Sequence, residues 1–172
     1  MNGKIIAIDT REKEFENKLR KLKAGDVIML SGIMHTMRDR AHKRAVELLE
    51  EGRKLPFEIK VVFHASPIIV NNRIISIGPT TSARMEKETK KLLGKTGLVM
   101  VLGKGGMGRS TFGKKGIYCA LTGGAGAYYA QFLRIKKKYW RDLGAETVYE
   151  LEARKVPALV AIAKGKNLYA LL

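Results

Sequence analysis

The sequence predicts an α/β protein with a mixed β-sheet in a single domain. Short β-prone apolar runs recur along the 172 residues, and segments with helical spacing of apolar residues separate some of them. No long-period repeat, low-complexity segment or Pro/Ser-rich linker divides the chain. We therefore expect residues 1–172 to form one domain.

Ten apolar runs are the expected strands. They comprise residues 5–8, 27–30, 61–63, 68–70, 74–77, 98–102, 117–121, 148–151, 158–162 and 168–172. Asn71 and Asn72 stand between two of these runs, and adjacent asparagines tolerate a tight turn. The runs on either side of them should therefore form a hairpin.

Two segments carry apolar residues at helical spacing and end at a glycine. One stripe consists of Ala41, Ala45, Leu48 and Leu49 before Gly52, and the other of Met85, Leu92 and Leu93 before Gly94. Each of these segments is predicted to be a helix.

The composition is that of an ordinary globular protein, with 45% hydrophobic and 28% charged residues. No apolar stretch approaches the roughly 20 residues of a membrane span, and the N-terminal apolar run is too short for a signal peptide. The cytoplasm is the expected location.

Cys119, the only cysteine, has apolar neighbours typical of a buried core residue. One thiol cannot hold an iron–sulfur cluster, and the three histidines are too scattered to indicate a zinc site.

Lysine and arginine number 33 against 16 acidic residues, which gives a net charge of +17. This excess predicts an anionic partner: nucleic acid, an anionic substrate or an acidic protein surface. The basic run at residues 134–141 makes a nucleic-acid-binding protein the main alternative from another functional class. A solvated basic face explains such a run more simply, and no sequence signature of a common nucleic-acid module is present.

The first of three candidate anion-binding turns spans residues 31–39. Thr36 and Asp39 resemble a helix-capping pair, so the helix is expected to begin near Met37. Free N–H groups at a helix start attract anions, and Arg38 adds a fork of donors shaped for a carboxylate. His42 lies one turn later on the same face. Taken alone, this motif favours a simpler interpretation, in which Arg38 and Asp39 only charge a solvated helix start.

The second turn carries Thr80, Thr81 and Ser82 in a row, more hydroxyl groups than helix capping needs. Pro79 suits a helix entry, and Arg84 should sit about one turn inside, facing the same pocket. Hydroxyl, N–H and guanidinium groups that converge in this way indicate a carboxylate or phosphate site.

The third turn, residues 102–110, has four glycines in six positions, which let a backbone approach a ligand closely. Lys104 precedes most of these glycines, so the turn matches neither a phosphate-binding loop nor a dinucleotide fingerprint, and a nucleotide site is a weak option. A fourth glycine-rich piece, residues 122–127, suits close packing at a strand–helix junction. The three turns together indicate a pocket for a small polyanion, without an obvious strong base or nucleophile.

Four motifs in this order resemble the class I iron–sulfur fumarases. They are Thr36-x-Arg38-Asp39-x-x-His42, Gly78-Pro79-Thr80-Thr81-Ser82-x-Arg84-Met85, Gly103-Lys104-Gly105 and Gly123-Gly124-Ala125-Gly126-Ala127. More specifically, residues 23–172 resemble the C-terminal domain of the one-chain enzymes and the β subunit of two-subunit fumarases and L-tartrate dehydratases. The resemblance implies a swivelling β/β/α domain.

The resemblance also implies a function as the β subunit of a hydro-lyase. The expected reaction is the interconversion of (S)-malate and fumarate, a step of the tricarboxylic acid cycle, with L-tartrate dehydration as the alternative. A separate α subunit would carry a 4Fe–4S cluster whose open iron binds the substrate hydroxyl, and this chain would bind no metal. An α2β2 assembly is expected, with the β subunit inactive alone. A stand-alone anion-binding module is a third possibility.

By resemblance, Arg38, Arg84 and Lys104 bind the substrate carboxylates, and Thr80 is the proton-abstracting residue. Thr81 is the alternative functional hydroxyl. A threonine hydroxyl is a weak base, so it needs an acceptor from the other subunit. The family usually has glycine where Met37 and Ala83 stand; Met37 either narrows the pocket or shows that a helical conformation is tolerated there.

Overall fold

The chain, whose computed structural model describes residues 5–113 and 116–171, contains one large mixed sheet and a separate two-stranded sheet, with helices on both sides of the long strands. The strands are β1 (Ile5–Asp9), β2 (Val27–Thr36), β3 (Val61–Phe63), β4 (Ile68–Val70), β5 (Arg73–Ser76), β6 (Met100–Gly103), β7 (Ile117–Ala120), β8 (Leu133–Tyr139), β9 (Val148–Ala163) and β10 (Lys166–Asn167). The α-helices are α1 (Phe15–Lys21), α2 (Asp39–Glu50), α3 (Glu86–Lys95), α4 (Arg109–Phe112) and α5 (Gly126–Ala130). Short 3-10 helices cover Ser82–Met85 (η1), Arg141–Glu146 (η2) and Leu168–Leu171 (η3).

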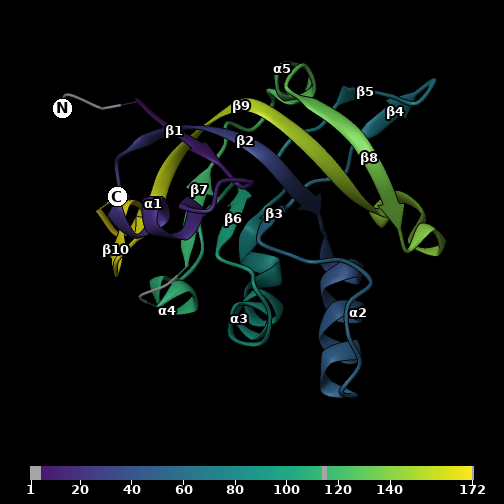
Figure 1. Ribbon diagram of the computed structural model, residues 1–172, viewed down its shortest axis with the longest axis horizontal. Helices are drawn as coiled ribbons and strands as arrows, with labels where there is room; N and C mark the ends of the chain where they lie inside the picture. Colours follow the sequence, from purple (N-terminus) through teal and green to yellow (C-terminus); the bar gives the residue numbers. More distant parts are fainter. Residues whose placement is uncertain (1–4, 114–115, 172) are drawn as a thin grey trace.

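The long strands β2 and β9 arch over the short strands β3, β6 and β7, and α2, α3 and α4 lie beneath them (Figure 1). Strand β2 runs parallel to β1 and β3, and the parallel series continues through β6 to β7. Strand β9 is antiparallel to both β7 and β2, so the pairing returns to β2 and closes a circuit. This arrangement confirms the predicted α/β class and mixed sheet.

Two apolar clusters follow from the alternation of side chains along the strands. Phe63 and Leu102 point into the cluster between the strand layers, whereas their neighbours Val62 and Val101 point toward the helices. Cys119 belongs to the first cluster and is fully buried, which confirms its predicted core role. Burial raises the pKa of its thiol to about 12, so the thiol is unreactive at neutral pH.

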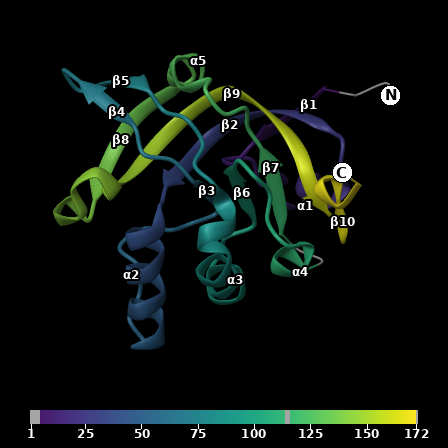
Figure 2. The ribbon, with the colours of Figure 1, turned by 180° about the vertical axis from the view of Figure 1, so that it is seen from behind.

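Both predicted helices are present as α2 and α3. The predicted hairpin is also confirmed, because Asn71 and Asn72 have φ angles of 46° and 60° between β4 and β5. Figure 2 shows this hairpin near α5, on the side of the long strands away from α2 and α3. None of the helices in the described part of the chain is long and apolar enough to cross a membrane.

Three predictions about the strands are wrong. The runs at 148–151 and 158–162 are one continuous strand, β9. The run from residue 168 is the 3-10 helix η3 as far as residue 171, and residue 172 lies outside the described residues. The basic run, which the sequence predicts to be a solvated face, contains strand β8. Among the described strands, β8 pairs only with β9. Its lysines suit an exposed sheet edge, because charge there opposes pairing with other chains.

The third error concerns the predicted turn at residues 31–39, because β2 continues through the first part of this segment to Thr36. Gly32 instead forms a bulge in β2 with φ of 102°. A Cβ at this position would lie 2.1 Å from Oγ1 of Thr10, and this oxygen accepts a 2.6 Å hydrogen bond from the backbone of Ile33. The glycine therefore serves the sheet, not a ligand.

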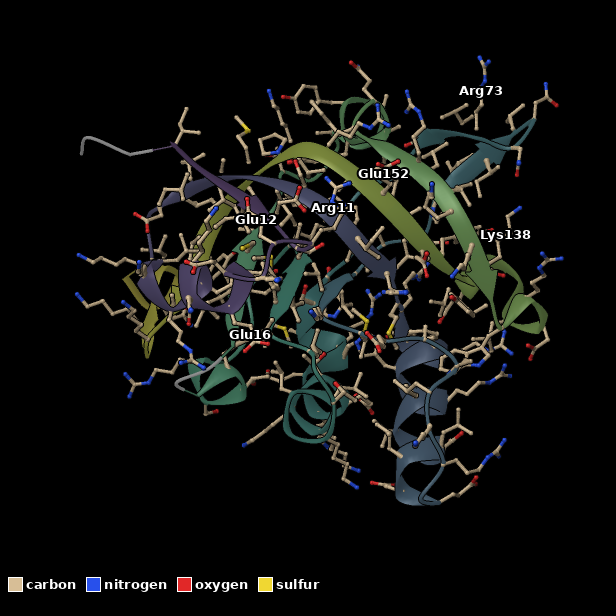
Figure 3. The ribbon with its side chains drawn as sticks, in the orientation of Figure 1. Arg11, Glu12, Glu16, Arg73, Lys138 and Glu152 are labelled. Carbon is tan, nitrogen blue, oxygen red and sulfur yellow. The ribbon has the colours of Figure 1, made fainter. Side chains whose placement is uncertain are left out.

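Charged side chains, among them Arg11, Glu152 and Lys138, lie on or beside the long strands and on the edge strand (Figure 3). Arg11 lies 3.7 Å from Glu152 on the arch, and Lys138 on β8 donates to the side chain of Asn72 in the hairpin turn. The basic surplus is thus spread over the molecule and includes a lysine-rich edge strand.

Candidate functional site

The carboxyl ends of the parallel strands β2, β3, β6 and β7 meet at one edge of the sheet, where α/β proteins commonly bind ligands. Arg38 follows β2, Lys104 follows β6, and the segment that contains Gly123 follows β7. The predicted turns therefore converge because the strands that precede them are neighbours.

The segment with the threonines is inserted between the ends of β3 and β6. The N–H of Thr80 donates to the carbonyl of His64 over 2.7 Å, and the N–H of Lys104 donates to the carbonyl of Thr80 over 3.2 Å. Ser82 then donates to the carbonyl of Lys104 over 3.0 Å, and Thr81 pairs with Lys104 in a parallel bridge. These bonds hold Thr80 and Thr81 beside Lys104 in an extended conformation.

The predicted helix entry at Pro79 is wrong, because η1 begins at Ser82 and Pro79 pairs with Ala65.

Arg84 joins the second predicted turn to the first. Its Nη2 donates to Oγ1 of Thr80 over 2.9 Å, and its Nε and Nη2 each lie 3.2 Å from a carboxylate oxygen of Asp39. The hydrogen bonds from Arg84 are the main reason why the pKa of Asp39 lies below its usual value. The same contact raises the pKa of Arg84, so the guanidinium is charged throughout the physiological range.

Arg38 and Lys104 are the other two cations at this edge. Arg38 is half-buried at the N-cap position of α2, and its Nε has no hydrogen-bond partner among the described residues. Lys104 is exposed, and within residues 5–113 and 116–171 its ammonium makes no ion pair. A Cβ on Gly123 would lie 3.4 Å from Cδ of Lys104, so the fourth glycine-rich piece adjoins this lysine.

The fourth glycine-rich piece also packs closely, as predicted. Gly126 opens α5, and its carbonyl accepts a 3.0 Å hydrogen bond from Ile77. A Cβ on Gly126 would lie 2.3 Å from Oγ of Ser76. The junction between β7 and α5 therefore needs a glycine where it meets the chain before Gly78.

The helix ends do not bind anions in the way that the sequence predicts. Helix α2 begins at Asp39, not near Met37, and the Thr36 hydroxyl accepts a bond from the N–H of Tyr149 instead of capping the helix. Glu146 of η2 caps α2 by accepting the N–H of Arg40 over 2.6 Å. At the third turn, the N–H of Gly108 donates to Glu86 over 2.8 Å. Both of these N–H groups bind carboxylates of the chain itself.

The two departures from the family pattern leave the site open. Met37 is buried in the cluster between strands and helices, and its N–H donates to the carbonyl of Phe63 over 3.0 Å. Its side chain therefore packs in the core and does not narrow a pocket. Ala83 is exposed on η1.

A buried polar cluster, absent from the predictions, lies beneath Arg38 and Thr80. The rings of His42 and His64 contact edge to face with centroids 4.9 Å apart. Nδ1 of His64 lies 2.9 Å from Oγ of Ser82, and the Tyr118 hydroxyl donates to the same Oγ over 3.1 Å. Burial lowers the pKa of both histidines, that of His64 well below its usual value. The spacing of His42 from Arg38 was the only sequence signal for this cluster.

The side chains gathered at this edge have the charges to pair with a small dianion, and the hydroxyl of Thr80 is a weak base. Arg38, Arg84 and Lys104 provide the positive charge, and Thr80 provides a hydroxyl group held by Arg84. In the described part of the chain, no three His, Cys, Asp or Glu side chains form a group that could hold a metal ion.

The profile of the family described as "Fumarase C-terminus" matches residues 1–172. The chain belongs to this family. An L(+)-tartrate dehydratase subunit beta of Escherichia coli strain K12 is 35% identical over 166 residues, which cover 88% of this chain and 81% of that protein. A Methanocaldococcus jannaschii protein, provisionally named as the same subunit, is 38% identical over 93% of this chain and 90% of its own length. A Geobacillus stearothermophilus protein, provisionally named a class I fumarate hydratase, is 35% identical over 88% of this chain and 31% of its own length.

Proposed function

We propose that this chain is the β subunit of a two-subunit iron–sulfur hydro-lyase that interconverts (S)-malate and fumarate in the cytoplasm. In this proposal residues 1–172 form one swivelling β/β/α domain. The proposal rests on the position of four residues at one edge of the sheet: Arg38, Thr80, Arg84 and Lys104. The chain that carries them is a member of the fumarase C-terminus family. Two separated carboxylates need several cations, and this edge provides three.

In the proposed reaction, the three cations bind the substrate carboxylates and stabilise the charge that builds up as the C–H proton leaves. Thr80 is the proposed proton-transfer residue and Thr81 the alternative. The guanidinium of Arg84 stabilises negative charge that develops on Oγ1 of Thr80, 2.9 Å away. An acceptor from the partner subunit receives the proton, because the Thr80 hydroxyl is a weak base and the Asp39 carboxylate is paired with Arg84.

The 4Fe–4S cluster belongs to the proposed α subunit. Cys119 is a single, fully buried thiol, so the described residues of this chain do not fit a cluster. When bound in the α subunit, the cluster supplies a Lewis acid for the substrate hydroxyl. The β subunit supplies substrate binding and proton transfer, and an α2β2 assembly is the expected form.

Dehydration of L-tartrate is the second candidate reaction. The names of the two relatives that this chain covers over 81% and 90% of their lengths favour it. Malate and tartrate are both 2-hydroxy dicarboxylates, so the cations on this chain suit either substrate.

Reconstitution tests the proposal. The purified chain is combined anaerobically with the α subunit, and fumarate hydration and L-tartrate dehydration are measured by steady-state kinetics. We expect the chain alone to bind no iron and to be inactive, and the combination to be active on one of the two substrates. Hydration by the iron-free chain alone would overturn the two-subunit proposal, and an inactive, cluster-loaded combination would overturn the proposed reaction.

A further inference from the structure

The buried cluster beneath the cations cannot bind substrate directly. His42, His64, Ser82 and Tyr118 have no exposed surface. They nevertheless contact the backbone or side chains of the segments that present Arg38 and Thr80. Any effect of these four residues on the candidate site must therefore be transmitted through the segments that carry Arg38 and Thr80.

The hydrogen bond of His42 determines where its ring carries a proton. Nδ1 of His42 lies 3.0 Å from the carbonyl oxygen of Arg38, which can only accept. Burial lowers the pKa of His42, so the ring is neutral at pH 7. The hydrogen therefore sits on Nδ1, and Nε2 carries a lone pair.

The opposite assignment follows for His64. The Tyr118 hydroxyl donates to Oγ of Ser82, and among the described residues Nδ1 of His64 is the one other hydrogen-bond partner of this Oγ. The buried Ser82 hydrogen is therefore satisfied only if it is donated to Nδ1 of His64. Burial and the nearby charge of Arg84 keep the His64 ring neutral. Nδ1 is then the acceptor, and the hydrogen sits on Nε2. In the described part of the chain neither Nε2 has a partner; one is a donor and the other an acceptor.

Each ring is tied to one side of the candidate site. His42 holds the carbonyl of Arg38 at the start of α2. His64 holds the other side twice, because its carbonyl accepts the Thr80 N–H and its ring contacts Ser82 two residues later. The space beside Ser82 is tightly packed, because a Cβ on Gly103 would lie 1.9 Å from Oγ of Ser82.

We propose that His42 and His64 are positioning residues, a neutral pair of opposite tautomers that holds Arg38 and Thr80 in the geometry needed for carboxylate binding and proton transfer. The roles of Arg38 and Thr80 in the reaction rest on the proposed function. The tautomers and the contacts of the two rings can be tested without an activity measurement.

The first test reads the tautomers in the full chain, labelled with ¹⁵N, at neutral pH. Long-range ¹H–¹⁵N spectra distinguish a protonated from a bare ring nitrogen. We expect one neutral ring with its hydrogen on Nδ1, assigned to His42, and one with its hydrogen on Nε2, assigned to His64. Two identical tautomers, or a charged ring at either position, would overturn the pairing.

The second test uses substitutions that remove or keep the relevant contact. Asparagine places its amide group near the position of Nδ1, so His42→Asn and His64→Asn can keep the bonds to Arg38 and Ser82, whereas alanine cannot. We expect each alanine variant of the reconstituted complex to lose about tenfold in kcat, and each asparagine variant to recover most of it. Failure of asparagine to restore kcat in both positions would refute a positioning role.

His35 provides a matched control. It is also buried, and its Nε2 has no hydrogen-bond partner among the described residues. Its ring stacks on Phe57, however, and is not the ring that bonds Arg38 or Ser82. His35→Ala should lower the melting temperature while kcat per folded complex stays unchanged. Equal losses of kcat per folded complex in the His35, His42 and His64 alanine variants would refute the inference.

Hydrogen exchange separates this inference from the proposed function. The Thr80 N–H donates to the backbone carbonyl of residue 64, and the His64 ring holds the same segment through Ser82. Loss of the ring contact should loosen this segment, so exchange of the Thr80 N–H should accelerate in His64→Ala and not in His64→Asn or His35→Ala. If the wild-type complex lacks hydro-lyase activity, the proposed function fails, while tautomers and Thr80 exchange still decide the positioning role. Unchanged Thr80 exchange in His64→Ala would overturn it.

Discussion

Arg84 holds the hydroxyl of Thr80 at 2.9 Å through Nη2 while Asp39 holds the same guanidinium from the opposite element. One arginine therefore couples the start of α2 to the segment between β3 and β6. The planar fork of donors matters here, because both Nε and Nη2 contact Asp39 and Nη2 also contacts Thr80. A point charge could not satisfy this arrangement.

Replacing Arg84 with lysine should therefore lower kcat/KM of the reconstituted complex about a hundredfold, or roughly 3 kcal/mol in transition-state stabilisation. The charge stays but the fork is lost. Steady-state kinetics measure the effect, and thermal unfolding should change little. Arg44→Lys is the matched control, because Arg44 makes a similar two-pronged contact with Asp142 outside the site. An Arg84→Lys efficiency within about twofold of wild type would remove Arg84 from the site.

Asp39→Asn should have a smaller effect than Arg84→Lys. The substitution weakens the hold on Arg84 but leaves its bond to Thr80, so we expect kcat/KM to fall a few-fold, by roughly 1 kcal/mol. The ion pair is partly exposed, with 47% and 32% of the two side chains accessible, so the free energy of unfolding should change by less than about 1 kcal/mol. A loss as large as that of Arg84→Lys would show that Asp39 has a separate role in the reaction.

Gly103→Ala should destabilise the chain by roughly 1–3 kcal/mol, because the new Cβ overlaps the space of a buried group. It would lie 1.9 Å from Oγ of Ser82 and 3.3 Å from the Tyr118 hydroxyl. Chemical denaturation measures the change. Gly94→Ala is the control, because Gly94 lies in α3 and a Cβ added there would meet open space. Alanine should raise the free energy of unfolding by about 0.5–1 kcal/mol through its higher helix propensity. Equal effects at both glycines would contradict the tight packing at Ser82.

Protonation of His35 should contribute to destabilisation of the chain by acid between about pH 6.5 and 4. Burial lowers the pKa of His35 to about 4, although Glu150 lies 3.6 Å away and acts in the opposite direction. The contact with Glu150 is therefore not an ion pair at neutral pH, because burial is the larger effect. The unfolded chain binds the proton first, so its protonation draws the equilibrium toward unfolding as the pH falls.

The loss of unfolding free energy from His35 should reach about 3 kcal/mol near pH 4, at roughly 1.4 kcal/mol for each pH unit. Denaturation series at several pH values measure it. His35→Asn should show a shallower slope, with a remainder from His42 and His64, whose pKa values are also lowered by burial. An unchanged slope in this variant would assign the acid sensitivity to other groups.

The sequence alone determined the parts that depend on near neighbours. The stripe of Ala41 and Ala45 predicted α2, and adjacent asparagines predicted the β4–β5 hairpin, because helix spacing and turn conformation are local properties. The placement of Arg84 four residues after Thr80 correctly brought the two groups together, although a 3-10 helix and not an α-helix does so. The family motifs predicted the cations of the site, whose roles stay predictions.

Only the tertiary structure decided which distant residues meet. Glu146 caps α2 across 106 residues of sequence, and His64 reaches His42 because β3 lies beside the end of β2. The basic run became strand β8 because β9 offers it an open edge, which overrides the low strand preference of lysine. These outcomes depend on the closed order of strands, and local sequence cannot encode them since the pairing partner of each strand is set by packing across the whole sheet.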